Sequence, residues 1–328
     1  MSADGVLPLT TAALAVIVTA VLLATAWNRM RALGRSGLIL AAVLSVAATV
    51  ALQVNRMTEA YAPEPAGDPP AAAGDSGGSR LLSTTVAGRA SGLTLPMYVY
   101  LPAGYRAGGT RFPVIEALHG YPGSPRSWLR KMNVQAALDR EIAAGRMAPT
   151  VVLFPYQTPD QLLDTECTNL RGGPRTETFL VTDVPAYARQ HLRVRTDRAG
   201  WALTGYSAGA YCATNLALRH PGEYAAAASL SGYAEPGIAV GDGSEHTTNN
   251  PGWRLRHLPP PAEALWLGWA ADDRQSSADS RRLAAEARAP LSVTTATVAH
   301  GGHSYAVWRQ MVPPAFDWLS AHLARPQA

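Results

Sequence analysis

Two serines in the sequence are flanked by glycines, as the nucleophilic serines of hydrolases often are. Ser207 stands in the string GYSAG at residues 205–209, which reads G-x-S-x-G, and Ser76 stands in the protease-like string GDSGG at residues 74–78. A nucleophile elbow places its serine on a strained turn between a strand and a helix. Ser207 has this context, with an apolar run at residues 201–204 before it and a helix of small residues after it, whereas Ser76 has neither.

The protease interpretation of Ser76 also fails on chain order. In the chymotrypsin arrangement the histidine and the aspartate precede the serine, but the first histidine of this sequence is His119. Residues 62–79 are rich in Pro, Gly and Ala, and such a segment cannot bury enough surface to fold. We therefore predict Ser207 as the nucleophile and residues 58–80 as a flexible linker. A tight turn without chemistry is the alternative for Ser207.

A serine nucleophile needs a histidine base, which in this motif follows it in the chain after an acidic residue. His300 and His303 lie in the string AHGGHS, between the last expected strand and the last expected helix. His303 directly precedes the helix, so we favour it as the base and keep His300 as the fallback. The two histidines could instead be a metal pair, but no convincing third ligand accompanies them.

The acid that orients the histidine should follow the preceding strand. Asp272 and Asp273 come directly after the apolar run at residues 264–269. One of them should face His303, and the other should cap a turn. Asp272 is our first choice for the acid, and Asp273 is the alternative.

An oxyanion needs two backbone N–H donors placed where its charge develops. One is expected from Ala208, directly after the nucleophile, and the other from the loop after the third strand. That loop has the sequence LHGYPG at residues 118–123, and its proline has no N–H. Gly120 and Tyr121 remain, and we choose Tyr121.

The elements that must position these residues alternate between strand and helix from residue 81 onward. Short apolar runs with β-branched residues predict strands at 81–86, 93–101, 112–118, 150–154, 201–204, 225–230, 264–269 and 291–298. Helices are predicted at 128–144, 177–191, 208–220, 278–287 and 305–323. This alternation argues for one α/β domain, residues 81–325, with a largely parallel central sheet.

The chain begins with two apolar runs. Residues 7–27 and 38–54 carry no charge, and a membrane-spanning helix needs about 20 such residues. We therefore predict a membrane anchor of two transmembrane helices within residues 1–57. A cleaved signal peptide is disfavoured because the only early charge is that of Asp4. A pair of buried core helices is the remaining alternative.

The arginines around these runs predict the orientation of the anchor. Three arginines, Arg29, Arg31 and Arg35, lie between the two runs, whereas one arginine, Arg56, closely follows the second run. The positive-inside rule places the connecting loop in the cytoplasm. Everything after residue 54 should then lie on the outer side of the membrane.

Composition limits the partners. The net charge of +4 is modest, and no basic stripe alternates with aromatic residues, so we expect no nucleic-acid partner.

Cys167 and Cys212 are the two cysteines, and a disulfide between them is permitted outside the cytoplasm; the alternative is one buried and one exposed thiol. The polar segments 157–175 and 232–261 are expected to build the acyl or alcohol pocket.

Together these features resemble the Putative esterase family of α/β-hydrolases, which includes esterase D, feruloyl esterases and secreted mycolyltransferases. The resemblance extends from about residue 81 to 323. It rests on YVYLP at 98–102 with Tyr105, LHG at 118–120, GYSAG at 205–209 with HP at 220–221, and GGH at 301–303. It implies a triad of Ser207, Asp272 or Asp273, and His303, with Tyr121 and Ala208 as oxyanion donors.

The resemblance implies a serine-dependent carboxylic ester hydrolase that forms an acyl-enzyme and requires neither a cofactor nor a metal. Its substrate would be a small-molecule, lipid or cell-envelope ester outside the cytoplasmic membrane. The two apolar runs are similar to the anchor of some exported esterases of actinobacterial type. An acyltransferase with the same triad and a non-catalytic membrane-anchored binding protein are the alternatives.

Overall fold

The computed structural model describes residues 6–58, 78–105 and 109–327. The chain divides into two compact units, Met1–Ala66 and Gly67–Ala328. Ser76, and with it most of the predicted linker at 58–80, lies outside the described residues. The linker and Ser76 therefore stay predictions from the sequence.

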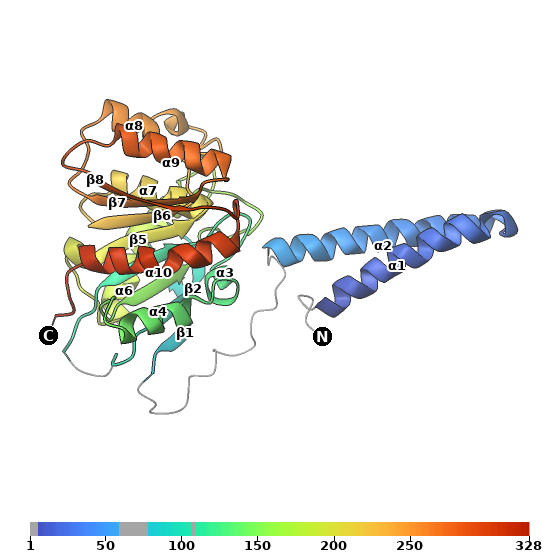
Figure 1. The fold of residues 1–328 in the computed structure, drawn as a ribbon, viewed down its shortest axis with the longest axis horizontal. Helices are drawn as coiled ribbons and strands as arrows, with labels where there is room; N and C mark the ends of the chain where they lie inside the picture. Colours follow the sequence, from blue (N-terminus) through green and yellow to red (C-terminus); the bar gives the residue numbers. More distant parts are fainter. Residues whose placement is uncertain (1–5, 59–77, 106–108, 328) are drawn as a thin grey trace. The chain divides into compact units, whose positions relative to one another are not determined.

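The first unit contains two helices in contact with one another (Figure 1). Helix α1 spans Val6–Ala26, the 3₁₀ turn η1 spans Trp27–Arg29, and α2 spans Ala32–Thr58. Helix α2 begins six residues before the predicted apolar run. Its Arg35 donates a hydrogen bond from Nε to the carbonyl of Trp27 at 3.0 Å, which closes the turn between the two helices.

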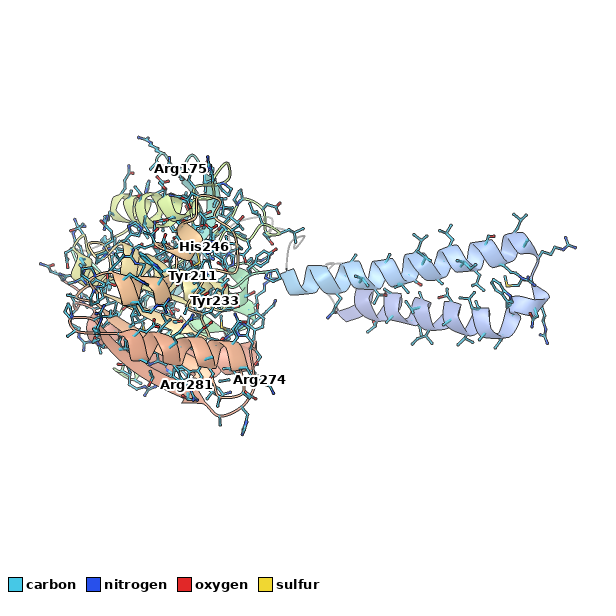
Figure 2. The ribbon with its side chains drawn as sticks, turned by 90° about the horizontal axis from the view of Figure 1, so that it is seen from above. Arg175, Tyr211, Tyr233, His246, Arg274 and Arg281 are labelled. Carbon is cyan, nitrogen blue, oxygen red and sulfur yellow. A yellow bond between two sulfur atoms is a disulfide. The ribbon has the colours of Figure 1, made fainter. Side chains whose placement is uncertain are left out.

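Both helices are long and apolar enough to cross a membrane. The qualifying windows are Thr10–Arg29 and Ala32–Gln53, and neither window is buried inside the protein. Large aliphatic side chains such as Leu14 are exposed along both helices, and Figure 2 shows side chains projecting outward along their length. This exposure excludes the alternative of two buried core helices. A membrane anchor and a signal sequence both agree with it.

The second unit is built on one eight-stranded sheet. Its strands are β1 (Arg80–Ala87), β2 (Thr94–Leu101), β3 (Val114–Leu118), β4 (Val151–Pro155), β5 (Trp201–Tyr206), β6 (Ala226–Leu230), β7 (Ala264–Ala270) and β8 (Ser292–Val298). Their order across the sheet is β1-β2-β4-β3-β5-β6-β7-β8. Only β2 pairs antiparallel with its neighbours β1 and β4, and the other pairs are parallel. The predicted largely parallel sheet is confirmed.

The central strands form the core of this unit. Every residue of β3, β4, β5, β6 and β7 is buried, as in parallel strands that are covered by helices on both faces. The helices of the unit are α3 (Arg126–Arg130), α4 (Val134–Ala143), α5 (Thr176–Thr178), α6 (Val184–His191), α7 (Ala208–Arg219), α8 (Pro251–His257), α9 (Arg274–Glu286) and α10 (Tyr305–His322). Helices α4 and α10 pack together, and α8 packs against α7 and α9 (Figure 1).

Two predicted helices differ from the structure in detail. The helix predicted at 128–144 is divided at Asn133, whose φ of 51° is left-handed and cannot continue a helix. The helix predicted at 177–191 contains a π-helical turn at Phe179–Asp183, close to Pro185, which lacks the N–H that a regular helix uses. Helix α8 was not predicted, because it lies inside the polar segment 232–261.

Parallel pairing brings the predicted site residues to one edge of the sheet. Strand β5 ends just before Ser207, and β7 ends shortly before Asp272 and Asp273. Strand β8 ends before the turn that contains His303. The carboxyl ends of parallel strands share one edge, which is where open α/β sheets place their ligands.

Candidate active site

Ser207 lies on the turn between β5 and α7. Its backbone has φ 57° and ψ −124°, a conformation that residues with a side chain seldom adopt and that recurs at functional sites. Its N–H donates to the carbonyl of Leu230 at the end of β6, at 3.0 Å. The strained turn is therefore anchored to the neighbouring strand.

Two glycines make this turn sterically possible. A Cβ at Gly205 would overlap the carbonyl oxygen of Gly209, and a Cβ at Gly209 would overlap the carbonyl oxygens of Leu118 and His119. Helix α7 thus starts in direct contact with the loop after β3. The G-x-S-x-G spacing around Ser207 therefore has a packing reason in this fold.

The side chains of Ser207, His303 and Asp273 form a hydrogen-bonded chain. His303 Nε2 lies 2.8 Å from Ser207 Oγ, and His303 Nδ1 lies 2.7 Å from Asp273 Oδ2. The Asp273 side chain is 8% exposed, and that of His303 is 40% exposed. The second oxygen of Asp273 accepts the N–H of Ser276 at 3.3 Å, so the same carboxylate caps helix α9.

Our first choice for the acid, Asp272, is wrong in this structure. Its carboxylate points to the backbone of the histidine loop and accepts the N–H groups of Gly301 and Gly302 at 3.0 and 2.9 Å. These two donors hold the pKa of Asp272 below its usual value. The alternative, Asp273, is the residue that contacts His303. Chain position cannot separate two adjacent residues, because the direction of each side chain depends on how the strand ends.

His303 has further neighbours that sequence reasoning missed. The Trp308 ring stands edge-on to the imidazole, with centroids 5.0 Å apart. Ser276 Oγ donates to the carbonyl of Ser231 at 3.1 Å and lies 3.5 Å from His303 Nδ1. The fallback base, His300, is exposed and does not take part in the chain of hydrogen bonds.

The predicted oxyanion donors lie on both sides of the serine. Ala208 is the first residue of α7, and the first N–H groups of a helix have no acceptor within the helix. Gly120 is in close contact with the nucleophile, because a Cβ built on it would lie 3.0 Å from Ser207 Cβ. Tyr121 follows directly, and its hydroxyl donates to the carbonyl of Leu162 at 2.8 Å. The direction of the Tyr121 N–H stays a prediction.

The loop before Tyr121 is held by a residue that the sequence did not indicate. The side chain of Gln157 accepts the N–H of His119 and donates to its carbonyl, the latter at 3.0 Å. His119 is buried, and burial lowers its pKa to about 4, so its ring is neutral near pH 7. Its Nδ1 lies 3.0 Å from the carbonyl of Gly120. These contacts assign His119 a structural role in the loop.

A disulfide joins Cys167 to Cys212, which lies on α7 behind the elbow. Gln157 also contacts this pair, with Nε2 3.5 Å from Cys167 Sγ. Beside the disulfide, Tyr211 stacks on Tyr233 with centroids 5.2 Å apart (Figure 2). The segments expected to form the substrate pocket are thus tied to the helix that carries the nucleophile.

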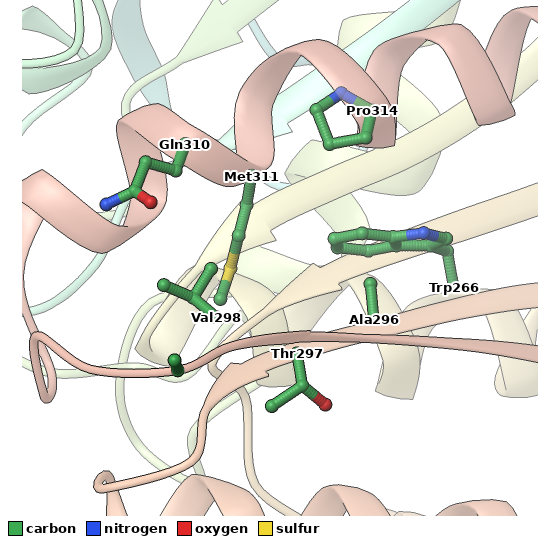
Figure 3. A pocket seen from close by; sticks show the side chains of 8 residues that line it. Trp266, Ala296, Thr297, Val298, Gln310, Met311 and Pro314 are labelled. Carbon is green, nitrogen blue, oxygen red and sulfur yellow. The ribbon is translucent and has the colours of Figure 1, made fainter.

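Two cavities lie in this region of the fold. One, of about 650 Å³, lies between the predicted pocket segments and α9, and it is lined by Asp164, Glu166, Tyr233, Glu235, Pro236, Gly237, Gln275, Asp279 and Arg282. The other, of about 390 Å³, lies between β7, β8 and α10 and is lined in part by Trp266, Met311 and Pro314 (Figure 3). Neither is lined by the three residues of the hydrogen-bonded chain. Within the described ranges, no group of three or more His, Cys, Asp or Glu residues is placed to hold a metal ion.

The sheet and the elbow define an α/β-hydrolase fold, and solved structures confirm this class. A ferulic acid esterase superposes with a TM-score of 0.64 at 19% identity, over 75% of this chain and 99% of its own. An S-formylglutathione hydrolase from Agrobacterium tumefaciens superposes with a TM-score of 0.64 at 14% identity, over 76% of this chain and 98% of its own. At these identities the similarity is one of fold.

The family follows from the sequence. Residues 90–319 match the Putative esterase family, and the chain belongs to that family. An uncharacterized protein of Corynebacterium glutamicum is 27% identical over 241 residues, which are 68% of this chain and 56% of that protein. The chain thus spans just over half the length of this relative.

Proposed function

We propose that the protein is a serine-dependent carboxylic ester hydrolase whose triad is Ser207, His303 and Asp273. The observation that carries the proposal is the position of His303, which is within hydrogen-bond distance of the serine hydroxyl on one side and of a buried carboxylate on the other. This is the arrangement by which a histidine can remove a proton from a serine nucleophile. The family assignment indicates the same reaction class.

The geometry supports a two-step reaction. His303 Nε2 takes the proton of Ser207 Oγ while this oxygen forms a bond to the ester carbonyl carbon. Asp273 holds the imidazole in place and stabilises its positive charge. The C–O bond to the alcohol then breaks, and the leaving oxygen takes the proton from His303. A water molecule, activated by the same histidine, hydrolyses the acyl-enzyme and restores the serine.

The negative oxygen of the tetrahedral intermediate would accept hydrogen bonds from the N–H groups of Ala208 and Tyr121. The position of Ala208 at the start of α7 supports this role, since a helix N-terminus favours negative charge. Tyr121 is supported by the contact between Gly120 and Ser207. The segments 157–175 and 232–261 would hold the acyl or alcohol part; together with α9 they line a cavity of about 650 Å³.

The site is proposed to lie outside the cytoplasmic membrane, anchored by α1 and α2. The exposed apolar surface of both helices supports a membrane location, and the arginines of the connecting turn favour the cytoplasm for that turn. The disulfide between Cys167 and Cys212 supports an oxidising compartment for the second unit. A reporter that works only outside the cytoplasm should be active when it is fused to the C-terminus. Activity of a C-terminal reporter that works only inside the cytoplasm would contradict the orientation.

The catalytic proposal is tested with the full chain in detergent and p-nitrophenyl esters of graded acyl length. Ser207→Ala should abolish turnover and labelling by a fluorophosphonate, because the nucleophile is removed. Ser76→Ala is the matched control, a serine with glycine neighbours that should be replaceable without loss. Activity that survives in Ser207→Ala while the fold is intact would overturn the assignment. An absence of both turnover and labelling in the wild type would favour a binding protein.

An acyltransferase would use the same three residues and differ in the acceptor. The assay is therefore repeated with and without an acceptor sugar, and acylated sugar is measured together with free acid. Hydrolysis predicts release of free acid that does not depend on the acceptor. Release that requires the acceptor would favour transfer.

A further inference from the structure

The carboxylate of Asp272 and the histidine loop form a second contact beside the triad. Each oxygen of Asp272 accepts one backbone N–H, from Gly301 at 3.0 Å and from Gly302 at 2.9 Å. His303 is the next residue in the chain. The aspartate directly before Asp273 therefore holds the backbone that carries the base, whereas Asp273 itself contacts the imidazole.

This turn needs such an anchor because its backbone conformation is unusual. Gly301 has φ 126° and Gly302 has φ 58°, values that are rare for residues with a side chain. A Cβ at Gly301 would also lie only 2.5 Å from Val307 Cγ2. At the far end of the turn, Ser304 donates to the carbonyl of Gly301 at 2.7 Å and caps α10. The turn is thus held by polar contacts at both ends.

The imidazole is packed on one side by the edge-on Trp308 ring and is otherwise open to solvent in part. The His303 side chain is 40% exposed, so packing alone does not determine its position. A displacement of the loop by about 1 Å would lengthen both hydrogen bonds of His303, and shifts of that size cost on the order of 100-fold in rate. The two N–H donors also favour the ionised form of Asp272, so the anchor persists at neutral pH.

We propose that Asp272 is a positioning residue for the catalytic base: it holds the Gly301–Gly302 backbone so that His303 lies between Ser207 and Asp273. This inference rests on the proposed function. Asp272 does not touch the reacting atoms. A purely structural cap would contribute to stability and leave the turnover of the folded protein unchanged.

A carboxylate elsewhere in the fold provides a matched control. Asp183 accepts two consecutive backbone N–H groups in the same way, from Ala90 and Ser91, both at 2.9 Å. Its pKa is lowered, with the hydrogen bonds from Ser91 and Ala90 as the causes that outweigh burial. This carboxylate holds the turn between β1 and β2, at the edge of the sheet remote from β8. Replacement of Asp183 therefore removes a comparable backbone cap without displacing His303.

The experiment compares kcat, KM and melting temperature for Asp272→Ala, Asp272→Asn and Asp183→Ala in the full chain. We expect Asp272→Ala to lower kcat about 10- to 100-fold with little change in KM. Asp272→Asn keeps one acceptor oxygen and should give an intermediate kcat. Asp183→Ala should lower the melting temperature at least as much and keep the kcat of the wild type. Fluorophosphonate labelling rates should follow kcat in all three variants.

A wild-type kcat in Asp272→Ala would overturn the inference, and so would an equal loss of kcat in Asp183→Ala. If Asp272→Ala does not fold, the kcat of Asp272→Asn is compared with that of Asp183→Asn. A wild-type kcat in Asp272→Asn, or an equal loss in both variants, would then overturn the inference. Failure of this inference is distinguishable from failure of the proposed function. If only this inference fails, Ser207→Ala is inactive and Asp272→Ala keeps the kcat of the wild type. If the proposed function fails, Ser207→Ala remains active.

Discussion

The two halves of the candidate site are held in place in different ways. The proposed nucleophile, Ser207, stands on an elbow between buried elements, and all residues of α7 from Ala208 to Leu218 are buried. The proposed base, His303, stands on a turn at the surface, and its side chain is 40% exposed. The elbow is positioned by close steric packing. The histidine turn instead donates hydrogen bonds to the carboxylates of Asp272 and Asp273 and accepts one from the Ser304 hydroxyl.

This difference predicts two kinds of mutational response. Changes on the elbow side should act on folding stability, because they disturb close packing. Changes on the histidine side should act on turnover, because the loop contributes little to the core. Four variants, each set against a control or the wild type, are expected to show effects that decrease in the order given below.

Asp273→Asn should have the largest effect. An amide in place of the buried carboxylate favours the wrong orientation and tautomer of His303, and in a comparable triad this substitution lowers kcat about 10⁴-fold. Asp272→Asn, at the neighbouring position, should lower kcat less than about 100-fold. Steady-state kinetics on both variants measures the gap, and equal losses in the two would contradict the distinct roles of these carboxylates.

Removal of the disulfide should act on stability. The bridge spans a sequence separation of 45 residues, for which loop-closure entropy corresponds to about 4 kcal/mol of unfolding free energy. The double variant Cys167→Ser with Cys212→Ser should lose about this much in denaturant unfolding, and kcat at 25 °C should change little. Reductant should lower the stability of the wild type and leave the double variant unaffected. Two free thiols in the unreduced, denatured wild type would show that the bridge is absent.

Gly209→Ala should destabilise the elbow. The added methyl group would overlap the backbone carbonyls of Leu118, the last residue of β3, and of His119. Overpacking of this kind costs about 3 kcal/mol at the upper end of its usual range. Gly222→Ala is the control, since no atom lies within 4 Å of the added group. Thermal unfolding should separate the two variants; equal melting temperatures would contradict the steric account of the motif.

Glu166 predicts a dependence of stability on pH. Burial raises its pKa from 4.5 to about 7, although it accepts hydrogen bonds from Tyr233 and Gly237. The native state keeps this proton to higher pH than the unfolded chain does. Its contribution to stability is therefore complete below about pH 4.5 and is lost as pH rises through about 7.

Between pH 5 and pH 8 the unfolding free energy should fall by about 2 kcal/mol on account of this one group. Glu166→Gln should flatten that part of the profile, because the amide does not titrate. Urea unfolding at several pH values measures both curves. The same slope in the variant and the wild type would assign the pH dependence to other groups.

Much of the fold could be predicted because its signals are local. The buried strands β3 to β7 fall on short apolar runs, and the elbow was recognised from a strand, a G-x-S-x-G turn and a helix in succession. Asn133 and α8 were missed for the opposite reason. A left-handed asparagine and a short helix in a polar segment leave no periodic pattern in the sequence.

The sequence by itself determined the class of the domain, the strand–turn–helix context that favours Ser207 over Ser76, and the position of His303 before the last helix, because chain order and local context carry that information. Only the tertiary structure decided between Asp272 and Asp273. The two differ by one position in the chain, and the path of the backbone after β7 turns one carboxylate toward the imidazole and the other toward the loop amides. Gln157 likewise reaches the site only through folding, since its contacts with His119 join residues that are 38 positions apart in the chain.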